Sequence, residues 1–127
     1  MRVGVPAAVK PDENRVALTP SGVTAFRTAG HEVVVQAGAG LGSAIPDTAY
    51  ERSGATIASH VAMVWEQADL VLKVKEPLAA EFEQMRPAQG PFSYLHLAVS
   101  RALTEQLLAR RVVAIAYETV QLADGTL

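Results

Sequence analysis

Short apolar runs rich in β-branched residues recur about every 20 to 30 residues along this chain, with helical patterns between them. The runs comprise residues 2–5, 31–36, 55–57, 69–77, 92–96 and 112–116. Strands that alternate with helices pair in parallel, because each helix carries the chain back along the sheet. We therefore predict an α/β fold, a doubly wound, mostly parallel sheet of Rossmann or flavodoxin type with helices on both faces. A chain of 127 residues suffices for a single such domain with its own core, but not for two.

Residues with known preferences for helix ends mark two of the predicted helices. Thr19 is expected to cap the first helix, with Pro20 at its first position and Gly30 just beyond its end. Asp47 is expected to cap a second, short helix, which Gly54 ends.

The last quarter of the chain predicts a helix, a strand and a turn. Ser100 is expected to cap the helix. Its predicted apolar face consists of Leu103, Leu107 and Leu108. Residues 112–116 have the pattern of a last buried strand, residues 117–122 of its extended continuation, and Asp124-Gly125 of a turn.

Composition narrows the classes of function. The net charge is −2 and the 11 Lys and Arg residues are scattered, so nothing indicates nucleic acid or a membrane surface as a partner. Cysteine is absent, which excludes disulfides, thiolate nucleophiles and Cys-ligated metals. No apolar run approaches the ~18 residues of a membrane span, and the amino terminus becomes polar too early for a secretory signal. We expect a cytoplasmic domain.

A glycine-rich stretch, residues 37–42, follows the second predicted strand, as a nucleotide-binding loop would. The dinucleotide fingerprint GxGxxG needs a third glycine where this chain has Ser43. It also needs a helix directly behind it, whereas Ile45 and Pro46 intervene here. We interpret the stretch as a plain loop between a strand and a helix.

Three cationic side chains are expected at the edge of the sheet where its strands end, which is where ligands bind in open α/β sheets. His96 closes one predicted strand, Lys75 stands near the end of another, and Arg15 lies in the long loop after the first. Guanidinium pairs with a carboxylate through two hydrogen bonds, and imidazole exchanges protons near neutral pH. The pattern predicts a site for a small carboxylate substrate beside His96.

Two of these residues have competing structural explanations. Lys75 and Lys73, expected on one face of their strand, are equally well explained as lysines whose stems line the strand exit. Arg15, taken alone, favours a salt bridge to Asp12 or Glu13.

The other ionisable residues carry weaker signals. Glu118, at the end of the last strand, could orient Arg15 or Lys75, although an ordinary exposed glutamate explains it better. His31 and His60 lack a place at a strand end and are taken as surface or capping residues. No His/Asp/Glu cluster has the spacing of a metal site, and no P-loop, HExxH or GxSxG motif occurs.

Seven segments, in order over the whole chain, carry a family resemblance. They are Arg2-Val3-Gly4-Val5-Pro6, Glu13-Asn14-Arg15-Val16-Ala17-Leu18-Thr19-Pro20, Gly30-His31-Glu32-Val33, Ala37-Gly38-Ala39-Gly40, Leu72-Lys73-Val74-Lys75-Glu76-Pro77, Tyr94-Leu95-His96-Leu97-Ala98 and Ala116-Tyr117-Glu118-Thr119-Val120-Gln121. Together they resemble the amino-terminal domain of the alanine dehydrogenase and pyridine nucleotide transhydrogenase superfamily. The Tyr-Leu-His segment resembles alanine dehydrogenase rather than transhydrogenase, while Ala7-Ala8 depart from the family's usual Lys-Glu.

The resemblance implies a reaction and roles for the candidate residues. The reaction is the reversible, NAD-dependent oxidative deamination of L-alanine to pyruvate and ammonia. Arg15 and Lys75 would hold the substrate's carboxylate and its carbonyl or amino end, and His96 would be the proton donor and acceptor. Tyr94 and Glu118 are candidate supporting residues.

The resemblance also implies what lies outside residues 1–127. In this family NAD binds a separate Rossmann domain, a later segment completes the first domain, and the enzymes assemble as hexamers. We therefore expect residues 1–127 to be the substrate-binding domain of such an enzyme, inactive as an isolated fragment. Two alternatives stay open: a non-catalytic stand-alone or engineered domain of the same fold, or the amino-terminal part of a transhydrogenase α subunit.

Overall fold

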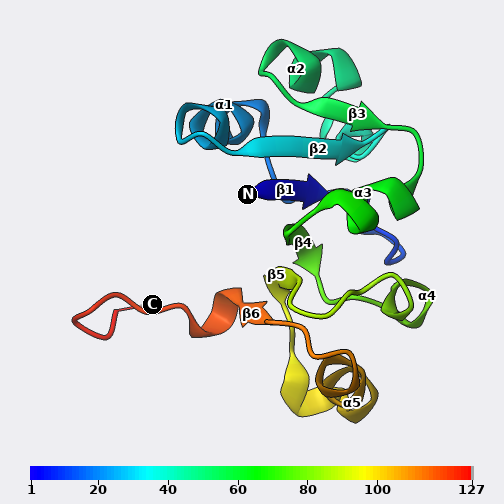
Figure 1. The fold of residues 1–127 in the computed structure, drawn as a ribbon, viewed down its shortest axis with the longest axis vertical. Coiled ribbons are helices and arrows are strands. Elements are labelled where there is room, and N and C mark those ends of the chain that lie inside the picture. The colour runs from blue at the N-terminus through cyan, green and yellow to red at the C-terminus, as the bar shows by residue number, and fades with distance from the viewer. Residues whose placement is uncertain (127) are drawn as a thin grey trace.

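The computed structural model describes residues 1–126, which form one sheet of six parallel strands in the order β3-β2-β1-β4-β5-β6 (Figure 1). The strands are β1 (Arg2–Val5), β2 (Glu32–Gln36), β3 (Thr56–Ala58), β4 (Leu70–Lys75), β5 (Gly90–Tyr94) and β6 (Ile115–Ala116). All six end at the same side of the sheet, here called the carboxyl edge. The strand order reverses between β1 and β4, and ligands bind beside such a reversal. The predicted α/β fold is confirmed.

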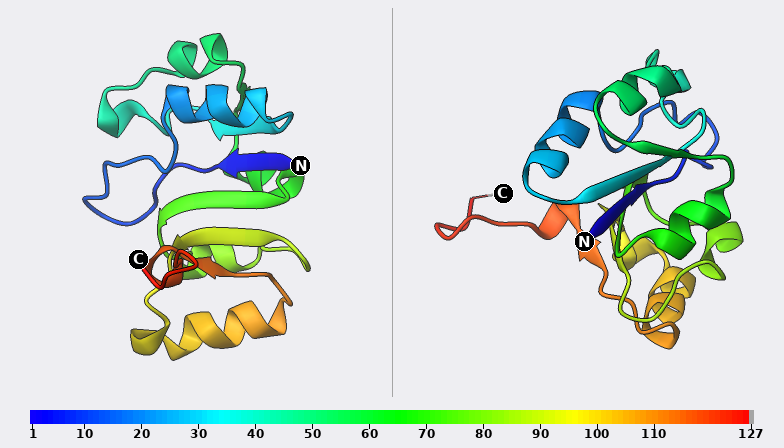
Figure 2. Two further views of the ribbon diagram at one scale, coloured as in Figure 1. Left: turned by 90° about the vertical axis from the view of Figure 1, so that its left-hand side faces the viewer. Right: turned by 45° about the horizontal axis from the view of Figure 1, so that its top comes forward.

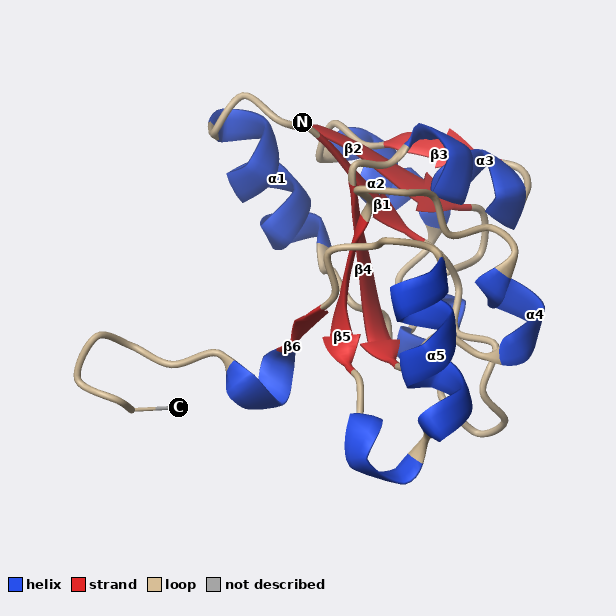
Figure 3. Ribbon diagram, turned by 60° about the horizontal axis from the view of Figure 1, so that its bottom comes forward, coloured by secondary structure: helices blue, strands red, loops and turns tan. Residues whose placement is uncertain are grey.

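Helices cover both faces of the sheet, as predicted. They are α1 (Pro20–Thr28), α2 (Asp47–Arg52), α3 (Val61–Gln67), α4 (Ala79–Phe82) and α5 (Arg101–Ala109), with 3-10 turns η1 (Leu41–Ser43), η2 (Leu97–Val99) and η3 (Tyr117–Thr119). Figure 3 shows α1 on one side of the sheet and α3, α4 and α5 on the other. Tyr50 of α2 lies in the same core cluster as Val23 of α1, so α2 is on the side of α1.

Alternation along the strands divides the core in two. Val33 and Val35 of β2 face α1 and α2, whereas Val34 between them faces α3, because successive side chains of a strand point to opposite faces. The first core consists of Val3, Val5, Val23, Val33, Val35, Ala39, Tyr50 and Leu72. The second consists of Trp65, Ala68, Val71, Met85, Leu103 and Leu107.

Most of the predicted helix ends are confirmed. The Thr19 hydroxyl accepts from Gly22 N, Pro20 begins α1, and Gly30 follows it with φ of 82°. The Ser100 hydroxyl accepts from Leu103 N. The cap predicted for α2 is wrong. Asp47 is the first residue of that helix, and its carboxylate accepts from Gly38 N at 2.9 Å instead of from the helix's own amides.

The predicted buried strand at residues 112–116 is wrong, because only Ile115–Ala116 pair with β5 and they form the edge of the sheet. Val113 is 59% exposed, and Leu108, predicted on the apolar face of α5, is 73% exposed. The chain then forms η3 instead of continuing extended. Figure 2 shows the segment after β6 leaving the sheet instead of covering it, although the predicted turn at Gly125 is present with φ of 85°. An apolar run alone does not tell a buried strand from an uncovered edge.

Gly4 in the middle of β1 allows α3 to lie close to the sheet. A Cβ at this position would lie 2.6 Å from the Cβ of Ala68 and 2.9 Å from Cγ1 of Val64. Neither neighbour is the far end of a flexible side chain, so a Gly4→Ala substitution must push α3 away. We expect a loss of about 1–3 kcal/mol in the free energy of unfolding, measured by urea denaturation.

Gly90 in β5 is the matched control. A Cβ there would meet the flexible end of Leu70 at 3.2 Å, which can turn aside. Gly90→Ala should therefore cost much less, and an equal loss in both variants would show that the contact with α3 is not the cause.

Candidate functional site

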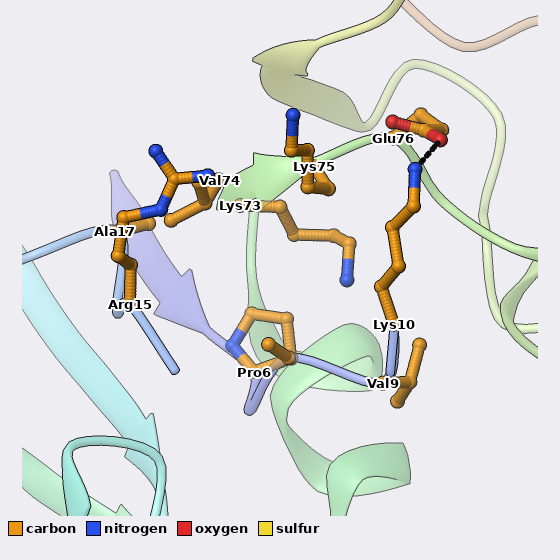
Figure 4. Close-up of a pocket in the computed structure, with 10 residues that line it drawn as sticks. Pro6, Val9, Lys10, Arg15, Ala17, Lys73, Val74, Lys75 and Glu76 are labelled. Carbon is orange, nitrogen blue, oxygen red and sulfur yellow. Dashed lines mark hydrogen bonds and ion pairs between the residues drawn. The ribbon is translucent and has the colours of Figure 1, made fainter. Parts of the chain in front are cut away.

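A pocket opens at the carboxyl edge between the loop after β1 and the end of β4 (Figure 4). Pro6, Ala8 and Val9 of the loop supply much of its apolar wall. Its lining cations are Lys10, Arg15, Lys73 and Lys75, and Glu76 is the acid among the lining residues. Parallel pairing brings the ends of β1 and β4 together, so the prediction that Arg15 and Lys75 share this edge is confirmed.

Arg15 forms a two-pronged ion pair with Glu13, one of the partners considered from the sequence. Its Nε donates to Oε1 at 2.8 Å and its Nη2 to Oε2 at 2.6 Å. The side-chain and then the backbone hydrogen bonds from Arg15 lower the pKa of Glu13 from 4.5 to about 2, with smaller help from the charge of Lys75. The same carboxylate raises the pKa of Arg15. Within residues 1–126 no hydrogen bond uses Nη1, so one edge of the guanidinium is available to another anion.

Lys73 and Lys75 do not share a face of β4, contrary to the prediction. The pairing of β4 with β5 shifts register between Leu72 and Lys75, and Figure 4 shows the two side chains leaving the strand in different directions. Lys73 is 5% exposed and donates to Glu81 at 2.7 Å, so it is a buried ion pair and not a lysine at the strand exit. Lys75 is half-buried and has no ion-pair partner within the described residues.

Glu81 is a partner that the sequence reasoning missed. It is 1% exposed, and its second carboxylate oxygen accepts from Leu78 N at 3.0 Å. An acidic residue in the first turn of α4 was the available signal, because carboxylates there commonly reach back to the backbone at the start of the helix.

His96 lies beyond β5, which ends two residues before it, so the prediction that the strand extends to His96 is wrong. Its backbone is left-handed, with φ of 49° and ψ of 41°, a conformation that non-glycine residues adopt at a cost. The imidazole lines a second, more apolar pocket with Pro77, Phe82 and Val99, not the pocket of Arg15 and Lys75.

Tyr94 is a neighbour of both Lys75 and His96. Its Cα pairs with that of Lys75 across the sheet, and its ring stacks on His96 with 6.1 Å between ring centroids. Tyr94 therefore lies between Lys75 and the imidazole of His96.

Glu118 holds the main chain at His96. One alternative from the sequence, that it orients Arg15 or Lys75, is wrong. Its carboxylate accepts from His96 N at 2.8 Å and from Leu95 N at 3.1 Å. The hydrogen bond from His96 N is the largest of several effects that lower the pKa of Glu118. A carboxylate from the segment after β6 thus stabilises the left-handed turn.

Glu76 joins the two pockets, because it lines both. Lys10 Nζ donates to its Oε1 at 2.8 Å, and Nδ1 of His96 lies 3.5 Å from its Oε2. Burial acts to raise the pKa of Glu76, but the hydrogen bonds from Lys10 and the main chain, together with the nearby His96 side chain, outweigh it, so the pKa is lowered. Glu76 is therefore an anion at neutral pH.

The glycine-rich loop does not fit a dinucleotide. The amide of Gly38 already donates to the carboxylate of Asp47, which places negative charge where a pyrophosphate would have to approach. A Cβ at Gly40 would lie 2.6 Å from the Ile45 carbonyl oxygen, so this glycine serves close packing of the chain on itself. The interpretation as a loop between β2 and α2 is confirmed.

Within residues 1–126 no group of three or more His, Asp or Glu side chains is placed to hold a metal ion. In the same part of the chain no helix has the length and apolarity needed to cross a membrane.

Comparison with known families matches residues 4–127 to the family described as "Alanine dehydrogenase/PNT, N-terminal domain". The chain belongs to this family. Arg15, Lys75, Tyr94 and His96 all lie within the matched residues.

Curated relatives of this chain include alanine dehydrogenases. The chain is 54% identical over 127 residues to that of Mycobacterium tuberculosis and 52% identical to that of Methanococcus maripaludis. In both cases all of this chain is matched, but only 34% of the relative. The chain therefore spans about a third of the length of these relatives.

Solved structures give the same family and fold. An L-alanine dehydrogenase superposes with a TM-score of 0.95 at 44% identity, covering 99% of this chain and 35% of that one. A transhydrogenase from Sinorhizobium meliloti superposes with a TM-score of 0.87 at 31% identity, covering 93% of this chain and 34% of that one. The predicted membership, with alanine dehydrogenases as the nearer of these relatives, is confirmed.

The buried pair of Lys73 and Glu81 should contribute strongly to stability. Glu81→Gln leaves the ammonium of Lys73 buried without its counter-charge, so we expect the free energy of unfolding to fall by about 3–5 kcal/mol in urea denaturation. Glu105→Gln breaks the exposed pair with Arg101 and is the control, with an expected change within about 0.5 kcal/mol. Equal effects in the two variants would contradict a special role for the buried pair.

Glu13 should make stability depend on acid pH. Because its pKa falls from 4.5 to about 2 on folding, its ionised form contributes stability above pH 4.5, and that contribution is lost as the pH falls toward 2. We expect the difference in Tm between wild type and Glu13→Gln to be positive above pH 4.5 and to shrink across this window. A difference that stays constant down to pH 2 would show that the pair with Arg15 does not depend on the charge of Glu13.

Proposed function

We propose that this chain is the substrate-binding domain of an NAD-dependent alanine dehydrogenase. The enzyme would convert L-alanine, NAD and water to pyruvate, ammonia and NADH, reversibly. The observation that carries the proposal is the meeting of Arg15 and Lys75 in one pocket, beside Tyr94 and His96, in a chain 54% identical to an alanine dehydrogenase.

Each side chain has a role that suits its chemistry. The free edge of Arg15 would bind the substrate carboxylate through paired hydrogen bonds, which fix orientation as well as affinity. The ammonium of Lys75, which no carboxylate within residues 1–126 neutralises at ion-pair distance, would meet the carbonyl or amino end. His96 would exchange the proton that the reaction releases or takes up near neutral pH.

The cofactor would be held by another part of the protein. Alanine dehydrogenases use NAD as a family, and the loop between β2 and α2 does not fit it, as described above. We place NAD on a Rossmann domain outside residues 1–127, expect this chain to be inactive alone, and expect a cytoplasmic homo-oligomer, a hexamer as in intact relatives. A later segment of the longer protein would cover the face of β5 and β6 that α1 and α2 leave open.

Two other functions have less support. The fold is shared with a transhydrogenase, but at 31% identity against 44% for the dehydrogenase structure. A non-catalytic domain of the same fold has in its favour only that the chain spans a third of its relatives. The paired cations beside an imidazole favour the dehydrogenase over both.

Arg15→Ala tests the carboxylate role. Loss of a charged hydrogen-bond donor is worth about 1.5–3 kcal/mol, so calorimetric titration of the 127-residue chain with pyruvate should give an affinity about 10- to 100-fold weaker. Lys75→Ala should weaken binding to a similar degree. Arg101→Ala, which removes an exposed guanidinium on α5, is the control and should leave the affinity unchanged.

Equal affinity in wild type and Arg15→Ala would remove Arg15 from the carboxylate role. Absence of binding to the wild-type chain would contradict a pocket formed by this domain alone. Alanine-dependent reduction of NAD by the isolated chain would contradict the placement of the cofactor elsewhere.

A further inference from the structure

We propose that Glu76 is a positioning residue that fixes which ring nitrogen of His96 carries the proton. The inference rests on the proposed function, in which His96 transfers a proton, and names the group that sets which nitrogen does so. Glu76 stands directly before Pro77 at the end of β4, and the sequence pattern assigns it no role.

The two carboxylate oxygens of Glu76 have different surroundings. Oε1 accepts from Lys10 Nζ at 2.8 Å. Oε2 is buried and has no hydrogen-bond partner within the described residues. The group that faces it is Nδ1 of His96, at 3.5 Å. That distance is the outer limit for a hydrogen bond between nitrogen and oxygen.

A buried carboxylate oxygen without a donor is costly, so the ring is stabilised in the form that supplies one. When the imidazole is neutral, this form carries its proton on Nδ1 and leaves Nε2 as the free base. When the imidazole is protonated, Nδ1 forms an ion pair with Glu76 and Nε2 holds the proton to be given up. In both directions of the reaction, Nε2 is therefore the nitrogen that exchanges a proton.

The position of the ring is fixed by other contacts as well. Glu118 holds the amide of His96 in its left-handed turn, and the ring of Tyr94 stacks on the imidazole. Pro77 restricts the backbone of Glu76 to extended conformations, which limits where its carboxylate can point. The charged groups around the imidazole are thus Glu76, its partner Lys10 and Glu118.

Nitrogen-15 NMR of the 127-residue chain tests the proposal directly, because the chain has only three histidines and His31 and His60 serve as internal references. At alkaline pH, where imidazoles are neutral, the shifts of the ring nitrogens report the tautomer. We expect His96 to carry its proton on Nδ1 in the wild type. Glu76→Met, which keeps the bulk of the side chain but removes both oxygens, should transfer the proton mainly to Nε2.

Lys10→Met is the matched control, because it removes the other partner of the same carboxylate and should leave the proton on Nδ1. A wild-type His96 with its proton on Nε2 would overturn the proposal, and so would an unchanged tautomer in Glu76→Met. If Glu76→Met does not fold, the wild-type and Lys10→Met spectra still decide.

The corresponding substitution in the full-length dehydrogenase separates positioning from structural support. Glu76→Met should lower kcat by about 10-fold or more while KM for pyruvate stays near its wild-type value, because Arg15 and Lys75 are untouched. A raised KM with unchanged kcat would overturn the proposal. If His96→Gln keeps full turnover, His96 does not transfer the proton. That outcome would contradict the proposed function, whereas the tautomer measured by NMR would still stand.

Discussion

Parallel pairing of all six strands is the constraint on which the rest of this structure depends. It places every strand end at one edge, so segments far apart in the sequence meet there. The loop after β1 brings Arg15, the end of β4 brings Lys75, and the turn after β5 brings His96. A single register shift near the end of β4 then separates the buried Lys73 from Lys75. The strand topology therefore brings these residues to one edge of the sheet, and side-chain contacts then arrange them there.

Of the cations that line the pocket, all but Lys75 form ion pairs with carboxylates of the described residues. Lys10 pairs with Glu76, Lys73 with Glu81, and Arg15 with Glu13. Lys75 has no carboxylate partner within residues 1–126. A small anion that enters the pocket thus meets an ammonium without a counter-charge and a guanidinium with one free edge. Such an arrangement favours a single carboxylate over a highly charged ligand such as a dinucleotide.

The short edge strand β6 explains why the pattern of residues 112–116 was misread. Residues 112–116 have the composition of a buried strand, yet most of them lie exposed beside β5. The chain spans about a third of the length of its curated relatives, so this edge corresponds to only part of what those proteins contain. Glu118 lies just after β6, and its carboxylate accepts a hydrogen bond from the His96 amide. The edge strand therefore affects the candidate site as well as the fold.

Local patterns were enough to predict the succession of strands and helices along the chain, most of the caps, and the edge of the sheet at which Arg15 and Lys75 meet. These features depend on periodicity and on the preferences of single residues such as Thr19 and Ser100. The pairing of Glu76 with His96, and of Glu118 with the His96 amide, could not be predicted, because the partners lie 20 or more residues apart. The left-handed turn at His96 was equally hidden, since an intrinsically unfavourable conformation is held by contacts that no local pattern encodes.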